Sequence, residues 1–223
     1  MARRTKVKNP KELIYVFCEG ESEMRYIEYM KDKFEKVSIL QAEKSSIPEA
    51  ENQFKNNPKL KYKLSELNEI WFFFDVEEYD QSNWNKWMTI IKRLRKKGSP
   101  TLKIRLLMTT ACVEYWFLLH YNRTALPIKS KSDKERVISR LKGNVSHYKK
   151  ADRTAIWEIA DHYDEAIKNG KWTLDIISTE LPIPTTPSPE RDAQLFRCGR
   201  SFTTVHEAIS HLEELSPTCH HAR

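Results

Sequence analysis

Glycine and long hydrophobic runs are both scarce in this sequence. Five glycines in 223 residues argue against a loop-dominated or repeat architecture. No stretch is long and apolar enough to span a bilayer, and the apolar run Leu13–Cys18 after the basic N-terminus is shorter than the core of a secretory signal. We therefore expect a globular cytoplasmic protein without a membrane partner.

Cysteine is also sparse, and the four cysteines show no C-x-x-C spacing. We predict reduced thiols and no disulfide framework. The residues that invite a zinc site are Cys198, His206, His211, Cys219 and His220. This alternative is disfavoured because His206 and His211 are five residues apart, which places them on different faces of a helix.

What the chain has in quantity is charge and aromatic surface. Charged residues make up 31% and aromatic residues 11%, a mixture that excludes a disordered chain because so many aromatic side chains can be buried. The net charge of +7 fits a polyanionic partner such as nucleic acid. It also fits many proteins that bind no polyanion.

Four apolar runs predict strands in the first half of the chain. Residues 70–74 and 13–18 show no polar alternation, which is typical of strands covered on both faces. Residues 37–40 and 102–108 predict two more, the last nearer the sheet edge. Amphipathic segments lie between them, so we predict an α/β fold with a mostly parallel four-stranded sheet flanked by helices.

The predicted organisation has three parts. Residues 1–12 form a basic N-terminal arm, residues 13–125 form the α/β core, and residues 126–223 form a helical extension packed on the core. Helices are expected over 23–34, 48–56, 83–97, 111–121, 153–169 and 205–215, with a loop over 182–189. Pro58 and Gly170 are expected to end helices.

Acidic residues come directly after the predicted strand at 70–74, which we expect to be the central strand of the sheet. Asp75, Glu77, Glu78 and Asp80 come directly after its apolar run, and open α/β sheets hold their ligands at the carboxyl ends of strands. Carboxylates crowded at this edge repel one another unless a cation lies among them. The alternative is a solvated loop that caps the next helix through Asp80 or Ser82.

The first strand also ends at an acid. Glu19 follows it, Gly20 permits a tight turn, and Ser22 can cap the helix that comes next. The carboxyl ends of parallel strands meet at one edge, so we expect Glu19 and Asp75 to lie together there.

Glu114 is a carboxylate in the first turn of an almost wholly apolar helix, for which Thr109 and Thr110 are candidate caps. Either it binds free N–H groups at the helix start, or it joins the other acids at the top of the sheet. Both alternatives stay open. His120, six residues further on, is expected to be a hydrogen bonder at the edge of the core rather than a base.

The segment after residue 128 is basic and has a helical pattern. Basic side chains interleaved with tyrosine and histidine suit phosphate contacts and base stacking, although a solvated helix face produces the same pattern. The candidate nucleic-acid-binding residues are Lys129, Lys131, Arg136, Arg140, His147, Tyr148, Lys149, Lys150 and Arg153.

Three stretches together resemble the RloB-like proteins, bacterial proteins with a Toprim-type fold often linked to phage defence. They are V-F-C-E-G-E-S-E at 16–23, F-F-D-V-E at 73–77 and T-T-A-C-V-E-Y-W-F-L-L-H-Y at 109–121. G-R-S-F-T-T-V-H-E-A-I is similar to the family's closing stretch. The third motif is the most specific, and in it Ala111 and Val113 replace the Pro and Phe of the family pattern S-N-P-x-F-E-x-W-x-L-L-H.

The resemblance implies a Toprim-like site. Glu19 matches the general acid or base, and Asp75 and Glu77 match the D-x-D pair that binds Mg²⁺, so the implied metal set is Glu19, Asp75 and Glu77. Glu114 matches a further site acid, which makes the implied catalytic set these four residues. Glu77 stands where the fold usually has Asp. It keeps the negative charge, but its side chain is one methylene longer, and this affects the affinity for Mg²⁺ because Mg²⁺ tolerates few coordination geometries.

The implied function is Mg²⁺- or Mn²⁺-dependent hydrolysis of phosphodiesters in RNA, with tRNA as one candidate, or in DNA. The resemblance implies a role in anti-phage defence together with a separately encoded ATPase. This chain has no P-loop, so any use of ATP would require another protein. One alternative is a non-catalytic nucleic-acid-binding or regulatory subunit. Another is phosphoryl or nucleotidyl transfer, since Toprim sites also serve primases.

Overall fold

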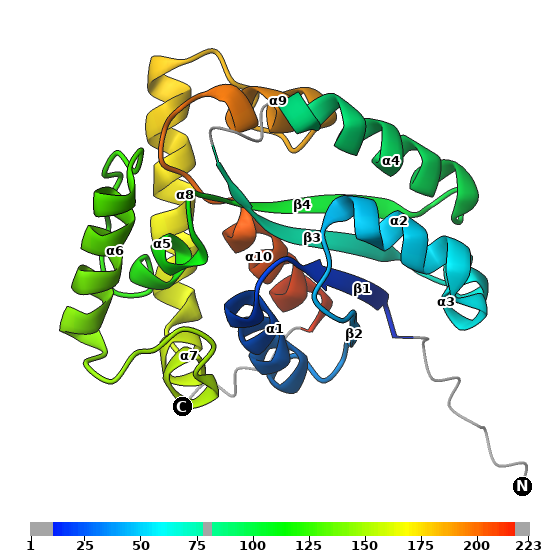
Figure 1. The fold of residues 1–223 in the computed structure, drawn as a ribbon, viewed down its shortest axis with the longest axis horizontal. Coiled ribbons are helices and arrows are strands. Elements are labelled where there is room, and N and C mark those ends of the chain that lie inside the picture. The colour runs from blue at the N-terminus through cyan, green and yellow to red at the C-terminus, as the bar shows by residue number, and fades with distance from the viewer. Residues whose placement is uncertain (1–10, 78–81, 217–223) are drawn as a thin grey trace, which may run out of the picture.

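The computed structural model describes residues 11–77 and 82–216. A four-stranded, all-parallel sheet with strand order β2-β1-β3-β4 lies between layers of helices (Figure 1). The strands are β1 (Leu13–Cys18), β2 (Ser38–Gln41), β3 (Glu69–Val76) and β4 (Lys103–Thr110). The α/β fold class, the four strands and the edge position of the last strand are confirmed.

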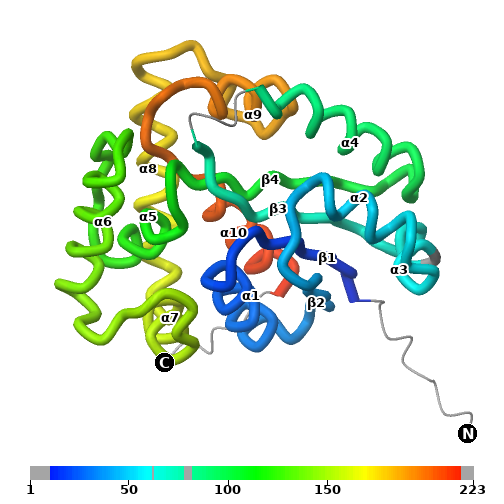
Figure 2. The backbone as a smooth tube through the Cα atoms, viewed as in Figure 1, coloured from blue at the N-terminus to red at the C-terminus, as the bar shows by residue number. Residues whose placement is uncertain are grey.

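Helices cover both faces of the sheet (Figure 2). One core contains Val16 and Phe73 with α1 (Glu21–Lys33) and α10 (Val205–Leu215). The other contains Phe17 and Phe72 with the remaining covering helices. These are α2 (Ile47–Asn56), α3 (Pro58–Lys63), α4 (Trp84–Lys97) and α9 (Pro189–Arg197). Successive strand residues point to opposite faces, which is why β1 and the middle of β3, residues 70–74, are apolar without alternation.

A further group of helices lies beyond the carboxyl ends of the strands (Figure 1). It comprises α5 (Val113–Leu118), α6 (Lys131–Asn144) and α7 (Arg153–Ala160), next to the long α8 (Tyr163–Glu180). In the described part of the chain, no helix is both long and apolar enough to cross a membrane. The division into arm, core and extension stays a prediction.

Two predicted helix ends are wrong. Pro58 begins α3 instead of only ending a helix, because Asn57 accepts a hydrogen bond from the Lys59 amide and caps a new turn. Residues 153–169 are not one helix, since α7 ends at Ala160 and α8 begins at Tyr163. Gly170 lies inside α8, where a Cβ would come within 2.9 Å of the His206 side chain.

The proposed helix caps differ as well. Gly20 is the N-cap of α1, and Ser22 lies inside that helix. Thr109 and Thr110 belong to β4, so Cys112 takes the N-cap position of α5. Asp80 lies outside the described residues, and Asn83, not Ser82, takes the N-cap position of α4.

Buried Glu69 joins the start of β3 to β4 and α10. Its carboxylate accepts hydrogen bonds from Trp71 Nε1 at 2.7 Å and Arg105 Nε at 2.6 Å, and it lies 2.9 Å from His211 Nε2. Burial raises the pKa of Glu69, but these three donors outweigh it and bring the pKa to about 2. The ionised carboxylate therefore stabilises the fold above about pH 4.5, and this stability is lost as pH falls toward 2.

We predict that Glu69→Gln lowers the free energy of unfolding by about 3 kcal/mol at pH 7, because buried donors lose their charged acceptor. Urea unfolding followed by circular dichroism measures the change. Glu165→Gln, at an exposed position on α8, is the matched control and should change stability by less than about 0.5 kcal/mol. Equal stability of both variants would contradict the role of Glu69.

Candidate functional site

The parallel register brings the ends of β1 and β3 together. Cys18 is paired with Phe73, and the Glu19 amide donates a hydrogen bond to the Phe73 carbonyl at 3.2 Å. Asp75 lies two residues beyond Phe73 and is paired with Thr109 of β4. Glu19 and Asp75 therefore project from neighbouring strands at one edge of the sheet.

Asp75 is the centre of a group of carboxylates. Its Oδ1 is shielded from solvent and has no hydrogen-bond partner among the described residues. Burial raises the pKa of Asp75 well above its ordinary value, and the negative charges of four neighbouring acids raise it further. We call these five residues the acid cluster: Glu19, Glu23, Asp75, Glu77 and Glu114.

Glu23 is the member that the sequence analysis missed. It lies in the first turn of α1 and is 3% exposed, and burial is the main reason why its pKa rises to about 7. The signal was its spacing, because Glu23 precedes Tyr26 and Ile27 by three and four residues and so shares their buried face. A Cβ at Gly20 would come within 2.3 Å of Glu23 Oε2, so a side chain there would displace the Glu23 carboxylate. The backbone of Gly20 is extended and does not itself need glycine.

Glu114 belongs to the cluster and does not serve mainly as a helix cap. It is 1% exposed, and its Oε1 accepts a hydrogen bond from the Tyr148 hydroxyl at 3.1 Å. Its Oε2 is buried without a partner in the part of the chain that the structure describes. His120, as expected, is a buried hydrogen bonder that contacts Tyr26 Oη at 3.1 Å and the Trp116 carbonyl at 3.0 Å.

Two lysines offset part of this negative charge. Lys150 Nζ lies 3.4 Å from Glu114 Oε1, and the Glu114 charge raises the pKa of Lys150. Lys134 Nζ donates to Glu77 Oε1 at 2.9 Å. Lys134 was not among the predicted site residues, because only the packing of α6 against the end of β3 brings it to Glu77.

The basic segment is only in part an exposed surface. Tyr148 is 1% exposed, so the prediction that it stacks on bases is wrong: its ring is packed in the core and its hydroxyl contacts Glu114. Lys150 is exposed, but its ammonium group lies against Glu114 of the acid cluster. The remaining candidates are exposed, namely Lys129, Lys131, Arg136, Arg140, His147, Lys149 and Arg153.

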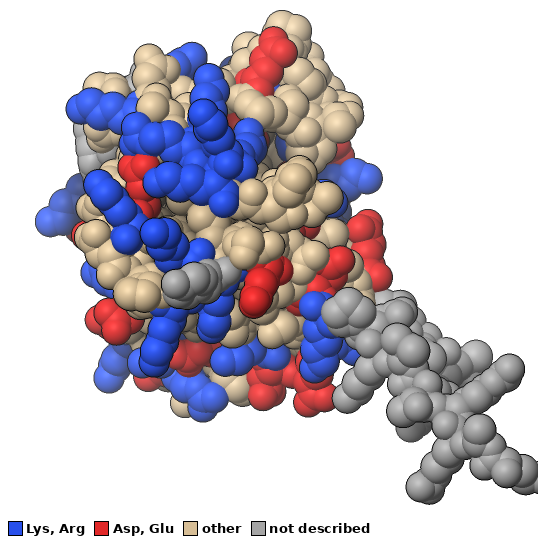
Figure 3. Space-filling view, turned by 90° about the vertical axis from the view of Figure 1, so that its right-hand side faces the viewer, with Lys and Arg blue, Asp and Glu red and all other residues tan. Residues whose placement is uncertain are grey.

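Several of these exposed cations have acidic neighbours within the protein. Arg136 pairs with Asp133 at 2.5 Å, and Arg153 lies 3.5 Å from Glu28. Figure 3 shows that lysine and arginine also gather on the face formed by α3 and the end of α4. The last turns of those helices carry Lys61, Lys63, Arg95, Lys96 and Lys97.

The donor set of the acid cluster suits a hard divalent cation. Two buried carboxylate oxygens, Asp75 Oδ1 and Glu114 Oε2, lack partners within residues 11–77 and 82–216, and Mg²⁺ prefers oxygen ligands. In the same ranges no three His, Cys, Asp or Glu side chains already converge at metal-binding distance. Metal binding by Glu19, Asp75 and Glu77 stays a prediction that requires the side chains to move.

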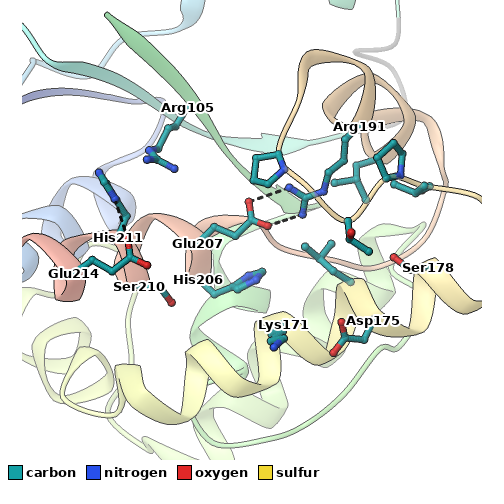
Figure 4. A pocket seen from close by; sticks show the side chains of 16 residues that line it. Arg105, Lys171, Asp175, Ser178, Arg191, His206, Glu207, Ser210, His211 and Glu214 are labelled. Carbon is teal, nitrogen blue, oxygen red and sulfur yellow. Dashed lines mark hydrogen bonds and ion pairs between the residues drawn. The ribbon is translucent and has the colours of Figure 1, made fainter. Parts of the chain in front are cut away.

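Away from the acid cluster, a pocket of about 410 Å³ lies between α8, α9 and α10 (Figure 4). His206 and His211 both line it, but Cys219 and His220 of the zinc alternative lie outside the described residues. Arg191, its most buried cation, donates to Glu207 at 2.5 Å and 3.1 Å. This pocket shares no residue with the acid cluster.

The comparison with protein families agrees with the motifs at the strand ends. The model of the RloB-like protein family matches residues 14–212, which include the whole acid cluster. The predicted resemblance is confirmed. A search of curated proteins gave no match.

The raised pKa values of Glu23 and Asp75 lower the free energy of unfolding as pH rises from about 4.5 to about 7, because both carboxyls bind more protons in the folded protein than in the unfolded chain. His120 and His206 act in the opposite direction, since burial lowers their pKa values to about 3 and about 4. We predict that Glu23→Gln removes the Glu23 contribution to the pH dependence and exceeds wild-type stability by about 2 kcal/mol at pH 8. Urea unfolding at several pH values measures this. The control Glu165→Gln should keep the wild-type pH dependence, and a wild-type pH dependence in Glu23→Gln would contradict the prediction.

Proposed function

The chain belongs to the RloB-like protein family, and from this premise we propose that it is a Toprim-type, Mg²⁺-dependent nuclease. The substrate is a phosphodiester of RNA, tRNA included, or of DNA. The observation that carries the proposal is the acid cluster, in which buried carboxylates lie close enough to raise the pKa of Asp75. Such a charge distribution favours a bound cation.

The residues that would hold the ion are the acids nearest Asp75. Asp75 and Glu114 each offer a buried oxygen without a partner in the described chain, and Glu19 and Glu77 lie near Asp75. A divalent ion bound there polarises a phosphodiester and lowers the pKa of bound water. Mn²⁺ prefers similar oxygen ligands and is the alternative ion.

Proton transfer has two candidate carriers in this cluster. The family resemblance assigns a general acid or base role to Glu19. Glu23 has a pKa of about 7, so it holds and releases a proton near neutral pH. Lys150, close to Glu114, carries positive charge to the same edge and can contact a substrate phosphate.

The role in phage defence and the partner ATPase rest on the family resemblance. The exposed cations from Lys129 to Arg153 and those at the ends of α3 and α4 supply the attraction for a polyanion that an acid cluster repels. We propose that nucleic acid spans from one of these surfaces to the cluster.

The second candidate is a non-catalytic nucleic-acid-binding or regulatory subunit of a defence complex. Two ion pairs favour it, because Lys150 and Lys134 already offset the charges of Glu114 and Glu77. A cluster neutralised by its own lysines can be stable without a metal ion. Activity and metal binding must therefore be tested separately.

Asp75→Asn should abolish cleavage while the protein stays folded, because it removes one charge with almost no change in shape. Wild type, Asp75→Asn and the exposed control Asp164→Asn are expressed with any neighbouring ATPase gene and challenged with phage, and the integrity of tRNA and DNA is followed. The control should behave as wild type. If Asp75→Asn still protects the cells, or if wild type cuts no nucleic acid, the binding-subunit candidate replaces the nuclease.

Mg²⁺ should raise the thermal unfolding temperature of wild type at pH 8, because a ligand that binds only the folded state stabilises it. Asp75→Asn should lose this shift, and Asp164→Asn should keep it. Differential scanning fluorimetry over a range of Mg²⁺ and Mn²⁺ concentrations measures it without reference to catalysis. An equal shift in all three proteins would place the ion elsewhere.

A further inference from the structure

A cavity of about 450 Å³ opens beside the acid cluster. It lies between the ends of β3 and β4, the segment before α6 and the segment after α9. Glu77 belongs both to the cavity wall and to the acid cluster. A ligand in this cavity would therefore lie next to the carboxylates.

The cavity wall combines an apolar floor with a cationic rim. The floor is formed by Val76, Ile128, Leu195, Phe196 and Phe202, and the rim by Lys129, Lys134 and Arg200. Its volume falls in the range of small-molecule sites, roughly 300–1,000 Å³. This wall suits a ligand with one flat apolar part and one anionic group, which is the chemistry of a nucleotide.

Two of the three rim cations, Arg200 and Lys129, are available for a phosphate, whereas Lys134 is paired with Glu77 at 2.9 Å. Arg200 pairs with Glu180 at 2.6 Å, and both side chains are about half exposed. Such exposed pairs contribute little, so a phosphate can replace the carboxylate. Lys129 is exposed and has no ion-pair partner among residues 11–77 and 82–216.

The backbone of one wall residue is strained. Ala111 has φ of 65°, in the left-handed region that is unfavourable for a non-glycine residue. Its amide donates to the Val76 carbonyl at 2.9 Å, so the contact with β3 holds the strained turn against the cavity. Strain of this kind clusters at ligand sites.

We propose that this cavity binds one unpaired nucleotide of the substrate, with its base on the apolar floor and its phosphate on the rim. The proposal rests on the nuclease function proposed above and specifies its substrate class. A base inside a duplex must be unpaired and unstacked before it can enter a pocket, whereas an unpaired base enters without this cost. The substrate is therefore single-stranded at or beside the bond that is cut.

The first test measures binding without Mg²⁺, so that no strand is cut. Fluorescence anisotropy compares labelled single-stranded RNA and DNA with duplexes of the same sequences, for wild type, Lys129→Glu, Arg200→Glu and the control Lys31→Glu. Lys31 is exposed on α1 and lines none of the cavities described. Both cavity variants should bind single strands at least about tenfold more weakly, and Lys31→Glu should bind as wild type. Equal losses in all three variants, or no loss, would overturn the proposal.

The second test locates the nucleotide and does not depend on a variant folding. Single strands that carry one photoreactive base are crosslinked to wild-type protein, and the peptides are identified by mass spectrometry. Crosslinks within 128–134 or 195–202 support the proposal, and crosslinks confined to other segments contradict it. If wild type cuts no nucleic acid yet crosslinks here, the nuclease fails and the nucleotide site stands. If it cuts duplexes as readily as single strands and Lys129→Glu has no effect, the site fails and the nuclease stands.

Discussion

Repulsion among buried carboxylates is the interaction on which the functional part of this structure depends. Asp75, Glu23 and Glu114 come from three different elements and lose hydration where they meet. Like charges in such a place can persist only when protons, lysines or a metal ion offset them. The first two are within reach of the cluster: Glu23, with a pKa of about 7, can hold a proton near neutral pH, and Lys150 places its ammonium 3.4 Å from Glu114.

The fold concentrates this charge because its sheet is parallel and covered on both faces. Apolar side chains of β1 and β3 fill two cores, so polar groups on these strands are confined to the strand ends. At the start of β3, hydrogen-bond donors outweigh the effect of burial. Glu69 is buried with three donors, and its pKa falls to about 2. Two acids on one strand thus have opposite pKa shifts, because Glu69 has three donors whereas Asp75 Oδ1 has no partner among the described residues.

The proposed nuclease function would require positive charge near the acid cluster. An acid cluster repels a polyanion, so in this proposal positive side chains would bring the substrate close before a bound ion offsets the carboxylates. Lys129, Lys134 and Arg200 surround the cavity next to Glu77 and meet this need at short range. The basic ends of α3 and α4, on another face of the molecule, act only at long range (Figure 3).

The sequence by itself determined the fold class, the four strands and the meeting of Glu19 with Asp75, because apolar runs without alternation indicate buried parallel strands. It did not reveal Glu23 or Lys134 as neighbours of these acids, and it placed Tyr148 on the surface. Those three placements depend on how α1, α6 and the segment before α7 pack on the ends of the strands. Local periodicity records which face of an element is apolar, but only tertiary packing decides which polar residues on different elements meet.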